Sequence, residues 1–591
     1  MLTVAELRRS YQAGQRRPAE VIHEIYSRIE TEGASPVWIS LVDRAMALRR
    51  AETVDPALPL GGIPFAVKDN IDVEGLPTTA ACPSFAYRAR RTAPVVRRLI
   101  EAGAILIGKT NLDQFATGLV GTRSPYGACP NAQWPGLVSG GSSSGSAVAV
   151  ATGLAHVALG TDTAGSGRIP AAFNNIVGLK PSRGLVSTQG VVPACRSLDC
   201  VSAFALTVDD AVRALAAMTR RDRTVAIDVP RVAASFTFAV PQRLQREFCG
   251  DRLAQDAFEA AIERLVALGG TVREIDYAPW REVAAMLYEG PRVAERHAAI
   301  RDFFDAQPDA LDPAVRAVIG GGRRYTATDA YAADARLAAL RRVLADTWEA
   351  CDVMVVPSAP TIFTIAQVSA EPIELNRRLG EYTNFVNLLD LSAIAVPSSM
   401  RPDGLPAGIT LIARSGSDLM VADLAQRFHV ASGLTLGAIG IAMPTPQPLA
   451  SRGDLTQLAV VGAHLSGMPL NRELVALGAR LVRRVRTSAN YRLYALRTSP
   501  PKPGLVRGEG GQAIEAEVWE LSHASFGAFV AAIPAPLGIG TLDLDDGTTV
   551  KGFLCEAHAT RDAEDISHHG GWRRYLAARS STCTLPSETT R

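Results

Sequence analysis

The sequence is poor in cysteine, and its few cysteines form no recognisable metal or redox pattern. Eight occur in 591 residues, and no two are spaced as a CxxC pair. Disulfide frameworks and zinc sites depend on clustered or regularly spaced cysteines. His558, His568 and His569 lie near one another, but no cysteine or carboxylate completes a ligand set with them. The sequence therefore predicts reduced thiols and no metal or other cofactor.

A long apolar segment is also absent. No run reaches the roughly 18 apolar residues that a membrane-spanning helix needs. The small-residue run 146–160 comes nearest, but Gly153 and His156 interrupt it, so we expect a buried helix there. Residues 1–17 contain no apolar segment typical of a signal peptide, and they include Glu6. These absences predict a cytoplasmic protein without a membrane partner.

An excess of charge of one sign is lacking too. The 61 lysines and arginines nearly balance the 59 aspartates and glutamates, which gives a formal net charge of +2. Strongly basic proteins attract nucleic acid or anionic membranes through their overall field. A nearly neutral chain gives no reason to expect such partners.

The length and the order of the expected elements favour two domains. At 591 residues the chain is long for a single hydrophobic core. Residues 1–442 alternate strand-like apolar runs with amphipathic helices, which indicates an α/β domain built on a mixed sheet. Expected strands lie at 63–68, 104–108, 236–240, 352–357 and 408–413, and expected helices at 93–102 and 253–268. A capping box of Thr3 and Glu6 marks the start of an opening helix.

The remaining residues differ in character. Residues 443–454 hold three prolines among polar residues and show no periodicity, as in a linker between domains. Residues 455–575 contain short strand-like pieces separated by glycine and proline turns, which predicts a small, β-rich α+β domain. Residues 576–591 are rich in serine and threonine and are expected to be a disordered tail.

The most informative stretch, residues 139–184, holds two glycine-rich segments that each contain a serine. Ser142 lies in GGSSSGS and Ser166 in TDTAGSGR. Dense glycine lets backbone amides approach a reacting atom without interference from side chains. Such a loop can bring a hydroxyl and several N–H groups to one point, which is what acyl transfer requires.

Three motifs in order make the sequence resemble the amidase signature family. GGSSSG begins at Gly140, GTDTAGSGRIP follows it, and GGIPFAVKDNID upstream supplies Lys68. The resemblance extends over residues 2–439, with Ala164 and Gly167 as departures from the residues usual in the family. The segments DQFATG, TDTAGSGR and LYEGPRVAER resemble the allophanate hydrolase branch.

This resemblance implies a mixed central sheet flanked by helices, followed by a smaller domain similar in fold to γ-glutamyl cyclotransferases. It implies Ser166 as the nucleophile, Ser142 as a bridging serine after a cis peptide bond, and Lys68 as the base. The backbone amides that it assigns to the oxyanion hole are those of Thr163, Ala164, Gly165 and Ser166. Asp162 and Arg168 are expected to orient this loop without reacting.

A lysine base has a physical requirement. The nine histidines offer no matching catalytic motif, and Lys68, the base that the resemblance implies, can act in their place if it is neutral. An ordinary lysine has a pKa near ~10.4, and a neutral amine at pH 7 needs a decrease of roughly 3 units, about 4 kcal/mol. Burial disfavours the ammonium and can produce such a decrease. Ile63, Phe65 and Val67 make the strand around Lys68 suitably apolar.

Two alternative interpretations of this centre remain open. Ser143 in GSSSG matches the G-x-S-x-G nucleophile elbow of α/β-hydrolases. That elbow directly follows an apolar strand, whereas residues 134–139 (WPGLVS) are typical of a loop. The other interpretation is a non-catalytic scaffold with a relic site, which does not explain why Lys68, Ser142 and Ser166 occur together.

The expected substrate follows from a tyrosine and an arginine in LYEGPRVAER. Tyr288 and Arg296 are eight residues apart, about two helical turns, and are expected on one face of a helix. An arginine fork suits a small carboxylate. The resemblance implies allophanate, a urea-like amide with one carboxylate, which would be degraded to ammonia and carbon dioxide. The alternative for Arg296 is a surface ion pair with Glu289 or Glu295. Further candidates for lining the pocket are Gly118, Gln114, Asn111 and Ser187.

In the second domain, the resemblance points to His464 and Asn471 in VVGAHLSGMPLN as ligand-binding candidates. Where cyclotransferases carry a catalytic glutamate, this chain has SFGAFVAAIPAPLG, which contains no acidic residue. The domain is therefore expected either to process the first product or to have a structural or dimerising role. Expected partners are a second copy of the chain and, in urea or cyanuric acid breakdown, a urea carboxylase or other enzymes of those pathways. The competing function is a hydrolase or transamidase of another small amide.

Overall fold

Two compact units make up the part of the chain that the structure describes. The computed structural model describes residues 2–219, 235–445, 455–477, 479–498 and 501–581. The first unit comprises the described residues up to 445 and the second those from 455 onward. Most of the expected linker, residues 446–454, lies outside the described residues.

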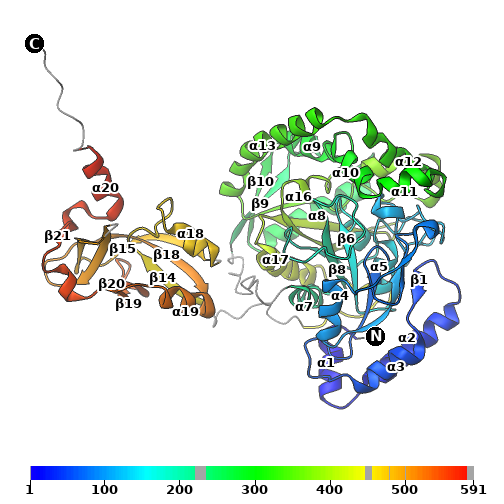
Figure 1. The fold of residues 1–591 in the computed structure, drawn as a ribbon, viewed down its shortest axis with the longest axis horizontal. Coiled ribbons are helices and arrows are strands. Elements are labelled where there is room, and N and C mark those ends of the chain that lie inside the picture. Colours follow the sequence, from blue (N-terminus) through cyan, green and yellow to red (C-terminus); the bar gives the residue numbers. More distant parts are fainter. Residues whose placement is uncertain (1, 220–234, 446–454, 478, 499–500, 582–591) are drawn as a thin grey trace, which may run out of the picture. The chain divides into compact units, whose positions relative to one another are not determined.

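An eleven-stranded mixed sheet forms the centre of the first unit (Figure 1). In spatial order its strands are β1 (Trp38–Leu41), β5 (Ile105–Thr110), β2 (Pro64–Lys68), β6 (Val157–Asp162), β8 (Cys200–Ala205), β7 (Val177–Lys180), β12 (Ser392–Met400), β13 (Pro406–Ala413), β11 (Val353–Pro357), β9 (Phe236–Pro241) and β10 (Gly270–Ile275). Strand β2 pairs in parallel with both β5 and β6, and β6 pairs antiparallel with β8. Strands β2 and β6 are buried along their whole length, as expected for strands covered on both faces. A separate hairpin consists of β3 (Pro77–Thr78) and β4 (Tyr87–Arg88).

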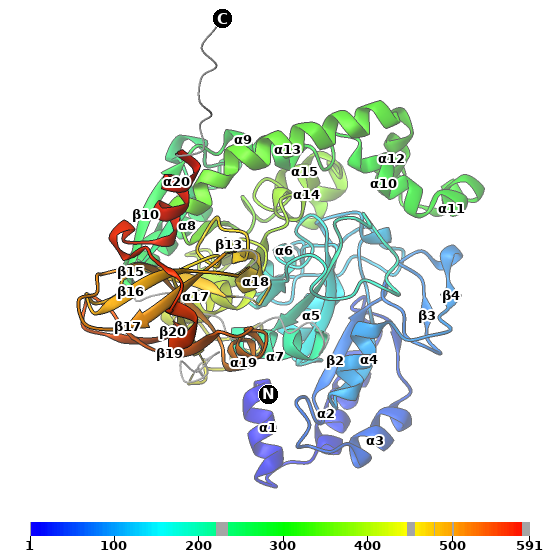
Figure 2. The same ribbon diagram turned by 60° about the vertical axis from the view of Figure 1, so that its left-hand side comes forward.

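Helices pack around this sheet (Figures 1 and 2). The first seven are α1 (Val4–Gln12), α2 (Pro18–Glu32), α3 (Arg44–Thr53), α4 (Pro94–Glu101), α5 (Ser144–Ala151), α6 (Ile169–Phe173) and α7 (Val208–Met218). They are followed by α8 (Arg252–Ala267), α9 (Ala278–Ala285), α10 (Arg292–Ala299), α11 (Arg301–Ala306), α12 (Pro313–Gly320), α13 (Ala327–Ala350), α14 (Ile365–Ala370), α15 (Glu374–Leu379), α16 (Phe385–Leu388) and α17 (Asp418–Ala431). Helix α5 packs on β2, β5 and β6, whereas α6 packs on β7, β12 and β13. Because α5 begins within the first glycine-rich segment and α6 directly after the second, both segments lie against the middle of the sheet.

The expected α/β architecture is confirmed, with one local correction. Thr3 Oγ1 accepts from the Glu6 N–H, and the Glu6 carboxylate accepts from the Thr3 N–H, so the expected capping box is present. The run 146–160 forms no single buried helix, because α5 ends within it and β6 begins within it. Gly153, with φ of 75°, lies between them, and a left-handed glycine is a common end of a helix.

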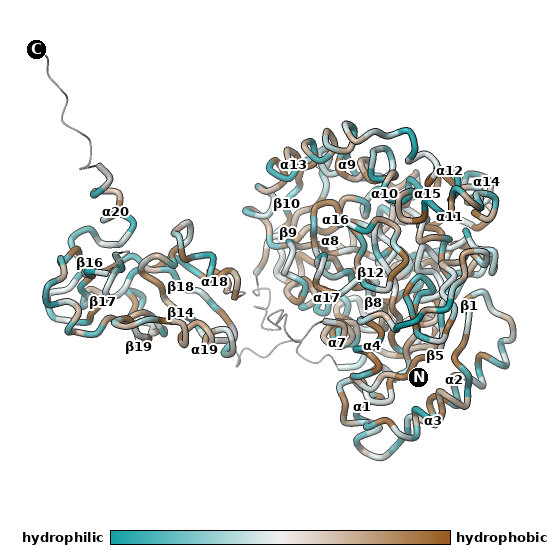
Figure 3. The backbone as a smooth tube through the Cα atoms, viewed as in Figure 1, coloured by the Kyte–Doolittle hydropathy of each residue, from teal (hydrophilic) through white to brown (hydrophobic). Residues whose placement is uncertain are grey.

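Hydrophobic residues of the first unit gather around its central strands (Figure 3). One large buried cluster joins residues of β11, β12 and β13 to residues of α9, α13 and α16. Trp280 on α9 meets Phe385 on α16 edge to face, with 5.2 Å between ring centres. This packing fixes the helices that follow β10 against the sheet.

The second unit is β-rich, as expected. Its five-stranded sheet has the order β15 (Arg480–Arg486), β18 (Glu515–Ser522), β14 (Leu455–Val460), β20 (Thr549–Cys555) and β19 (Leu537–Asp543). A three-stranded sheet consists of β17 (Lys502–Arg507), β16 (Tyr491–Leu496) and β21 (Glu564–Asp565), and the helices are α18 (Asn471–Ala476), α19 (His523–Ala531) and α20 (Trp572–Ser581). Residues 576–581 were expected in the disordered tail but belong to α20, whose start is anchored by the buried Trp572 and Tyr575. Residues 582–591 lie outside the described residues.

Candidate active site

Lys68, Ser142 and Ser166 are joined by a chain of hydrogen bonds. Lys68 ends β2, Ser142 precedes α5, and Ser166 lies between β6 and α6. Lys68 Nζ is 2.8 Å from Ser142 Oγ, and Ser142 Oγ is 3.0 Å from Ser166 Oγ. The peptide bond between Gly141 and Ser142 is cis, as the resemblance implies. Three separate parts of the sequence therefore bring an amine and two hydroxyls into one hydrogen-bonded chain.

These three side chains are almost completely enclosed. Even Ser166, the most accessible of them, is only 3% exposed. Burial lowers the pKa of Lys68 to about 7, although the carboxylates of Asp113, Asp199 and Asp162 favour its charged form. Near neutral pH a large fraction of this lysine is therefore an uncharged amine.

Thr161 belongs to the GTDTAGSGRIP motif, but the resemblance assigned it no role. Its buried Oγ1 accepts from Lys68 Nζ at 2.7 Å. A neutral amine has two N–H donors and one lone pair, so a bond donated to Thr161 leaves the lone pair available to the Ser142 hydroxyl. A sequence signal was present in this motif, and the structure shows why it matters. Strand β6, which carries Thr161, lies parallel to β2, which ends at Lys68.

Asp162 and Arg168 hold the loop that carries Ser166. Arg168 Nε and Nη2 donate to the two carboxylate oxygens of Asp162, each at 2.9 Å. The same carboxylate accepts from the amides of Gly165 and Gly167 at 3.1 and 3.0 Å. Both charged side chains are fully buried, so each needs the other as its counterion. This geometry agrees with the expected orienting role.

Three of the four amides assigned to the oxyanion hole have no acceptor among the described residues. The Gly165 N–H is bonded to the Asp162 carboxylate. Within the part of the chain that the structure describes, the N–H groups of Thr163, Ala164 and Ser166 have no acceptor. Gly165 has φ of 137°, whereas Ala164 does not adopt a positive φ. The alanine at 164 is therefore compatible with the loop.

Ser143 does not have the geometry of a nucleophile elbow. It is fully buried at the start of α5, and its Oγ donates to the Thr161 carbonyl at 3.2 Å. The preceding residues, 134–139, form turns and isolated bridges, with no strand among them. The G-x-S-x-G match therefore lacks the strand and the exposed hydroxyl that this motif requires.

Tyr288 and Arg296 meet, but they do not share one helix. Helix α9 ends before Tyr288 and α10 begins after Pro291, so the expected single helical face is wrong. The sequence Gly290-Pro291 explains the break, because glycine and proline disfavour a helix interior. Arg296 Nη2 nevertheless donates to the Tyr288 hydroxyl at 3.1 Å, and its guanidinium lies 4.9 Å from the centre of the tyrosine ring.

Arg296 is buried and forms no ion pair with a carboxylate in the described part of the chain, although the charges of Asp199 and Glu295 act on it from farther away. Its side chain is 1% exposed, Nη1 donates to Thr117 Oγ1 at 3.2 Å, and Nε has no partner in the described part of the chain. Glu295, one of the two surface partners considered, accepts instead from the N–H and hydroxyl of Ser197. A buried guanidinium without an anion is costly, so this position is suited to receive a carboxylate.

The other pocket candidates have structural partners. The Gln114 side chain donates to two backbone carbonyls and accepts one backbone N–H. The Asn111 amide donates to two carbonyls as well, and Ser187 Oγ accepts a backbone N–H at 3.3 Å. A Cβ at Gly118 would lie 2.4 Å from Asp113 Oδ2. These contacts give each of the four residues a role in loop packing that does not require a ligand.

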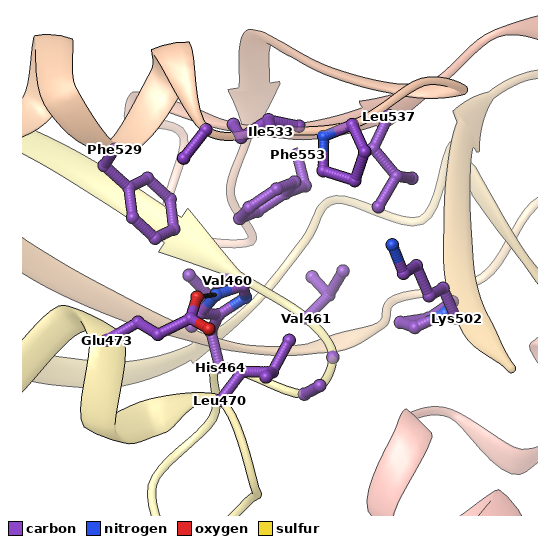
Figure 4. A pocket seen from close by; sticks show the side chains of 15 residues that line it. Val460, Val461, His464, Leu470, Glu473, Lys502, Phe529, Ile533, Leu537 and Phe553 are labelled. Atoms are coloured by element: carbon purple, nitrogen blue, oxygen red, sulfur yellow. Dashed lines mark hydrogen bonds and ion pairs between the residues drawn. The ribbon is translucent and has the colours of Figure 1, made fainter. Parts of the chain in front are cut away.

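A cavity of about 290 Å³ lies beside His464 in the second unit (Figure 4). His464 Nε2 is 3.2 Å from Glu473 Oε2, and its ring stacks on Phe553 with 5.5 Å between centres. Asn471 Nδ2 donates to the His464 carbonyl at 2.8 Å, so it supports this residue from behind and is not part of the cavity lining. Lys502 lines the cavity too. Glu473 was not predicted from the sequence, because an acidic residue was expected in a different segment.

The described residues contain no obvious site for a metal ion. No group of three or more histidine, cysteine, aspartate or glutamate side chains among them is arranged to hold one. No helix within the same residues is long and apolar enough to cross a membrane. Seven cysteines are described and all are free thiols, whereas Cys583 lies outside the described residues.

Comparison with known proteins identifies the family of this chain. The amidase family matches residues 20–422, and the allophanate hydrolase C-terminal domain matches residues 456–577. The urea amidolyase of Saccharomyces cerevisiae is 43% identical over 584 residues, which cover 93% of this chain and 32% of the yeast protein. This chain thus spans about a third of the length of that relative.

Two further relatives match this chain over most of their own length. The structure of Kluyveromyces lactis allophanate hydrolase is 40% identical, with a TM-score of 0.74 and coverage of 98% of this chain and 99% of that one. A glutamyl-tRNA(Gln) amidotransferase subunit from Symbiobacterium thermophilum is 34% identical over 483 residues, which are 73% of this chain and 96% of that protein. The chain belongs to the amidase family, and it carries an allophanate hydrolase C-terminal domain.

Proposed function

We propose that this amidohydrolase cleaves allophanate, with Ser166 as nucleophile, Ser142 as proton relay and Lys68 as base. The observation that carries the choice of substrate is Arg296, a buried guanidinium that forms no ion pair among the described residues and lies beside the hydroxyl of Tyr288. Allophanate supplies the missing carboxylate together with a small amide. The nearly full-length similarity to an allophanate hydrolase of known structure supports the same choice.

In the first half-reaction, neutral Lys68 accepts a proton from Ser142 while Ser142 accepts the proton of Ser166. The Ser166 oxygen then attacks the terminal amide carbon of allophanate, and the charge on the carbonyl oxygen is stabilised by backbone N–H groups. The amides of Thr163, Ala164 and Ser166 are the available donors, which revises the set implied by the resemblance by removing Gly165. The tetrahedral intermediate collapses, the relay returns the proton to the leaving nitrogen, and ammonia departs.

In the second half-reaction, water attacks the acyl group on Ser166. The neutral Lys68 removes a proton from this water through Ser142, and Ser166 leaves with that proton. The product is N-carboxycarbamate, a dianion that breaks down to ammonia and carbon dioxide. No metal or cofactor is used in this scheme.

The direct test is ammonia release by the purified chain from allophanate, acetamide and glutamine. We expect release from allophanate and little from the other two, because those lack the N-carboxylate that allophanate carries on the other side of the scissile carbonyl. Comparable rates with acetamide or glutamine would favour the competing function, a hydrolase or transamidase of another small amide.

Replacing Arg296 by glutamine is expected to lower kcat/KM for allophanate by about 30-fold or more. A buried charged partner is typically worth about 2–5 kcal/mol. Any slow hydrolysis of acetamide should not decrease, since acetamide has no carboxylate to bind. Arg301→Gln, which changes an exposed arginine of the next helix, is the matched control and should behave like the wild type. Equal losses with both substrates would show that Arg296 supports the fold instead of binding the carboxylate.

For the second unit, we propose that the cavity beside His464 binds the N-carboxycarbamate produced by the first. The cavity presents the His464–Glu473 pair and the cationic Lys502 against apolar walls (Figure 4). His464→Ala should leave the first ammonia unchanged and delay the second, as followed by time-resolved ammonia release. The exposed His558 provides the matched control, His558→Ala. Unchanged timing of the second ammonia in His464→Ala would favour a structural or dimerising role.

The assembly and location of the chain are also proposals. We propose a cytoplasmic homodimer, and we propose separately that it acts with a urea carboxylase. The second proposal is supported by urea amidolyases, which contain a region similar to nearly all of this chain within a protein about three times as long. Light scattering of the purified chain measures its mass in solution. A monomer at micromolar concentration would contradict the dimer.

A further inference from the structure

Asp113 is a buried carboxylate that the scheme above does not use. It follows β5 at the start of a 3₁₀ helix, Gln114–Ala116, and its side chain is inaccessible to solvent. Oδ2 accepts from the N–H groups of Val120 and Gly121 at 3.2 and 3.0 Å, and Oδ1 accepts from that of Arg123 at 3.0 Å. A carboxylate only accepts hydrogen bonds, so three N–H donors match its ionised form.

The same residue contacts the peptide that carries the bridging serine. The Asp113 N–H donates to the Ser142 carbonyl at 3.1 Å. A Cβ built on Gly141 would lie 2.0 Å from Asp113 Oδ2, and one on Gly118 would lie 2.4 Å from it. Only glycine permits such an approach. The backbone of Asp113 therefore bonds to Ser142 while its side chain packs directly on Gly141.

The charge of Asp113 also acts on Lys68. Burial lowers the pKa of Lys68, and among the groups that oppose this effect Asp113 has the largest influence, ahead of Asp199 and Asp162. These three carboxylates come from the loop after β5, the loop before β8 and the end of β6, respectively. Asp162 is neutralised by its ion pair with Arg168, whereas the partners of Asp113 are uncharged amides.

We propose that Asp113 is a positioning residue for amide hydrolysis, which holds the Gly141–Ser142 peptide so that Ser142 Oγ stays in reach of both Lys68 and Ser166. Asp113 acts through Ser142 and does not contact the substrate. The proposal rests on the relay proposed above and deepens it. The proposal also implies that the Asp113 carboxylate sets part of the electrostatic field at Lys68.

The test is Asp113→Asn, which keeps the shape of the side chain but removes its charge and one acceptor. We expect kcat/KM to fall roughly tenfold or more, since a buried N–H then faces an NH₂ group. The acid limb of the pH profile of kcat/KM should move to lower pH, because loss of a nearby negative charge lowers the pKa of Lys68 further. A role in folding alone would lower Tm and leave the acid limb in place. An unmoved limb in folded Asp113→Asn overturns the proposal.

Gly118→Ala provides a second variant that displaces the carboxylate without changing its charge. We expect a lower kcat/KM with the acid limb at its wild-type pH, and wild-type kcat/KM in folded Gly118→Ala would also overturn the proposal. Both variants are followed in addition by the pH dependence of Ser166 labelling with a fluorophosphonate. Labelling does not require allophanate, so a shifted labelling profile in Asp113→Asn supports the role of Asp113 even if the proposed substrate is wrong.

Discussion

Replacing Ser166 by alanine is expected to lower kcat for allophanate by about 10⁵-fold or more. Loss of the nucleophile in enzymes that work through an acyl intermediate has effects of this size. The structure offers no substitute, because the neighbouring Ser142 hydroxyl already bonds to Lys68 and lies one step farther along the relay. Covalent labelling by a fluorophosphonate should disappear together with the activity.

Ser143→Ala is the informative control for this experiment. Ser143 is the serine of the G-x-S-x-G match, but its hydroxyl is bonded to the Thr161 carbonyl inside the protein. The variant should therefore still be labelled at Ser166. Labelling that persists in Ser166→Ala and disappears in Ser143→Ala would contradict the assignment of the nucleophile and restore the elbow interpretation.

Much of the fold could be predicted because local patterns and the final packing agree. The apolar strand that ends at Lys68 and the helix 253–268 were both visible, since each has the period of its element and a terminating signal. The run 146–160 was harder, because small apolar residues fit a buried helix and a buried strand equally well. Only tertiary pairing of β6 with β2 and β8 separates the two.

The site could be predicted where chemistry depends on motifs and less well where it depends on distant contacts. The glycine-rich segments identify Ser142 and Ser166 from the sequence, whereas Thr161 is revealed only when its distance to Lys68 is known. The same applies to Glu473, which reaches His464 from a helix that no local motif marks. Spacing alone also placed Tyr288 on a helix that a Gly-Pro break prevents, although the contact with Arg296 forms across the break.

The pH dependence of the reaction should follow the protonation of Lys68. Because burial lowers its pKa to about 7, the amine is charged and inactive below that pH and neutral above it. With the neutral form as the base, kcat/KM should fall about tenfold per pH unit below pH 7 and level off above it. A profile that is flat from pH 5 to pH 8 would show that no group with such a pKa controls the reaction.

Replacing Lys68 by methionine should separate activity from stability. The loss of the base is expected to lower kcat/KM by about 10²–10⁴-fold.

Unfolded lysine keeps its ordinary pKa of 10.5, so between about pH 7 and pH 10.5 the unfolded chain binds one more proton at this position than the folded chain. The contribution of Lys68 to the free energy of unfolding therefore rises with pH across this window. Below pH 7 the folded protein bears the whole cost of burying a charged Lys68. Methionine carries no such penalty, so at pH 6 the inactive variant should unfold at the same urea concentration as the wild type or a higher one. A variant that is both inactive and less stable at pH 6 would mean that Lys68 is held as a charged, paired group, and a charged amine cannot accept the proton of Ser142.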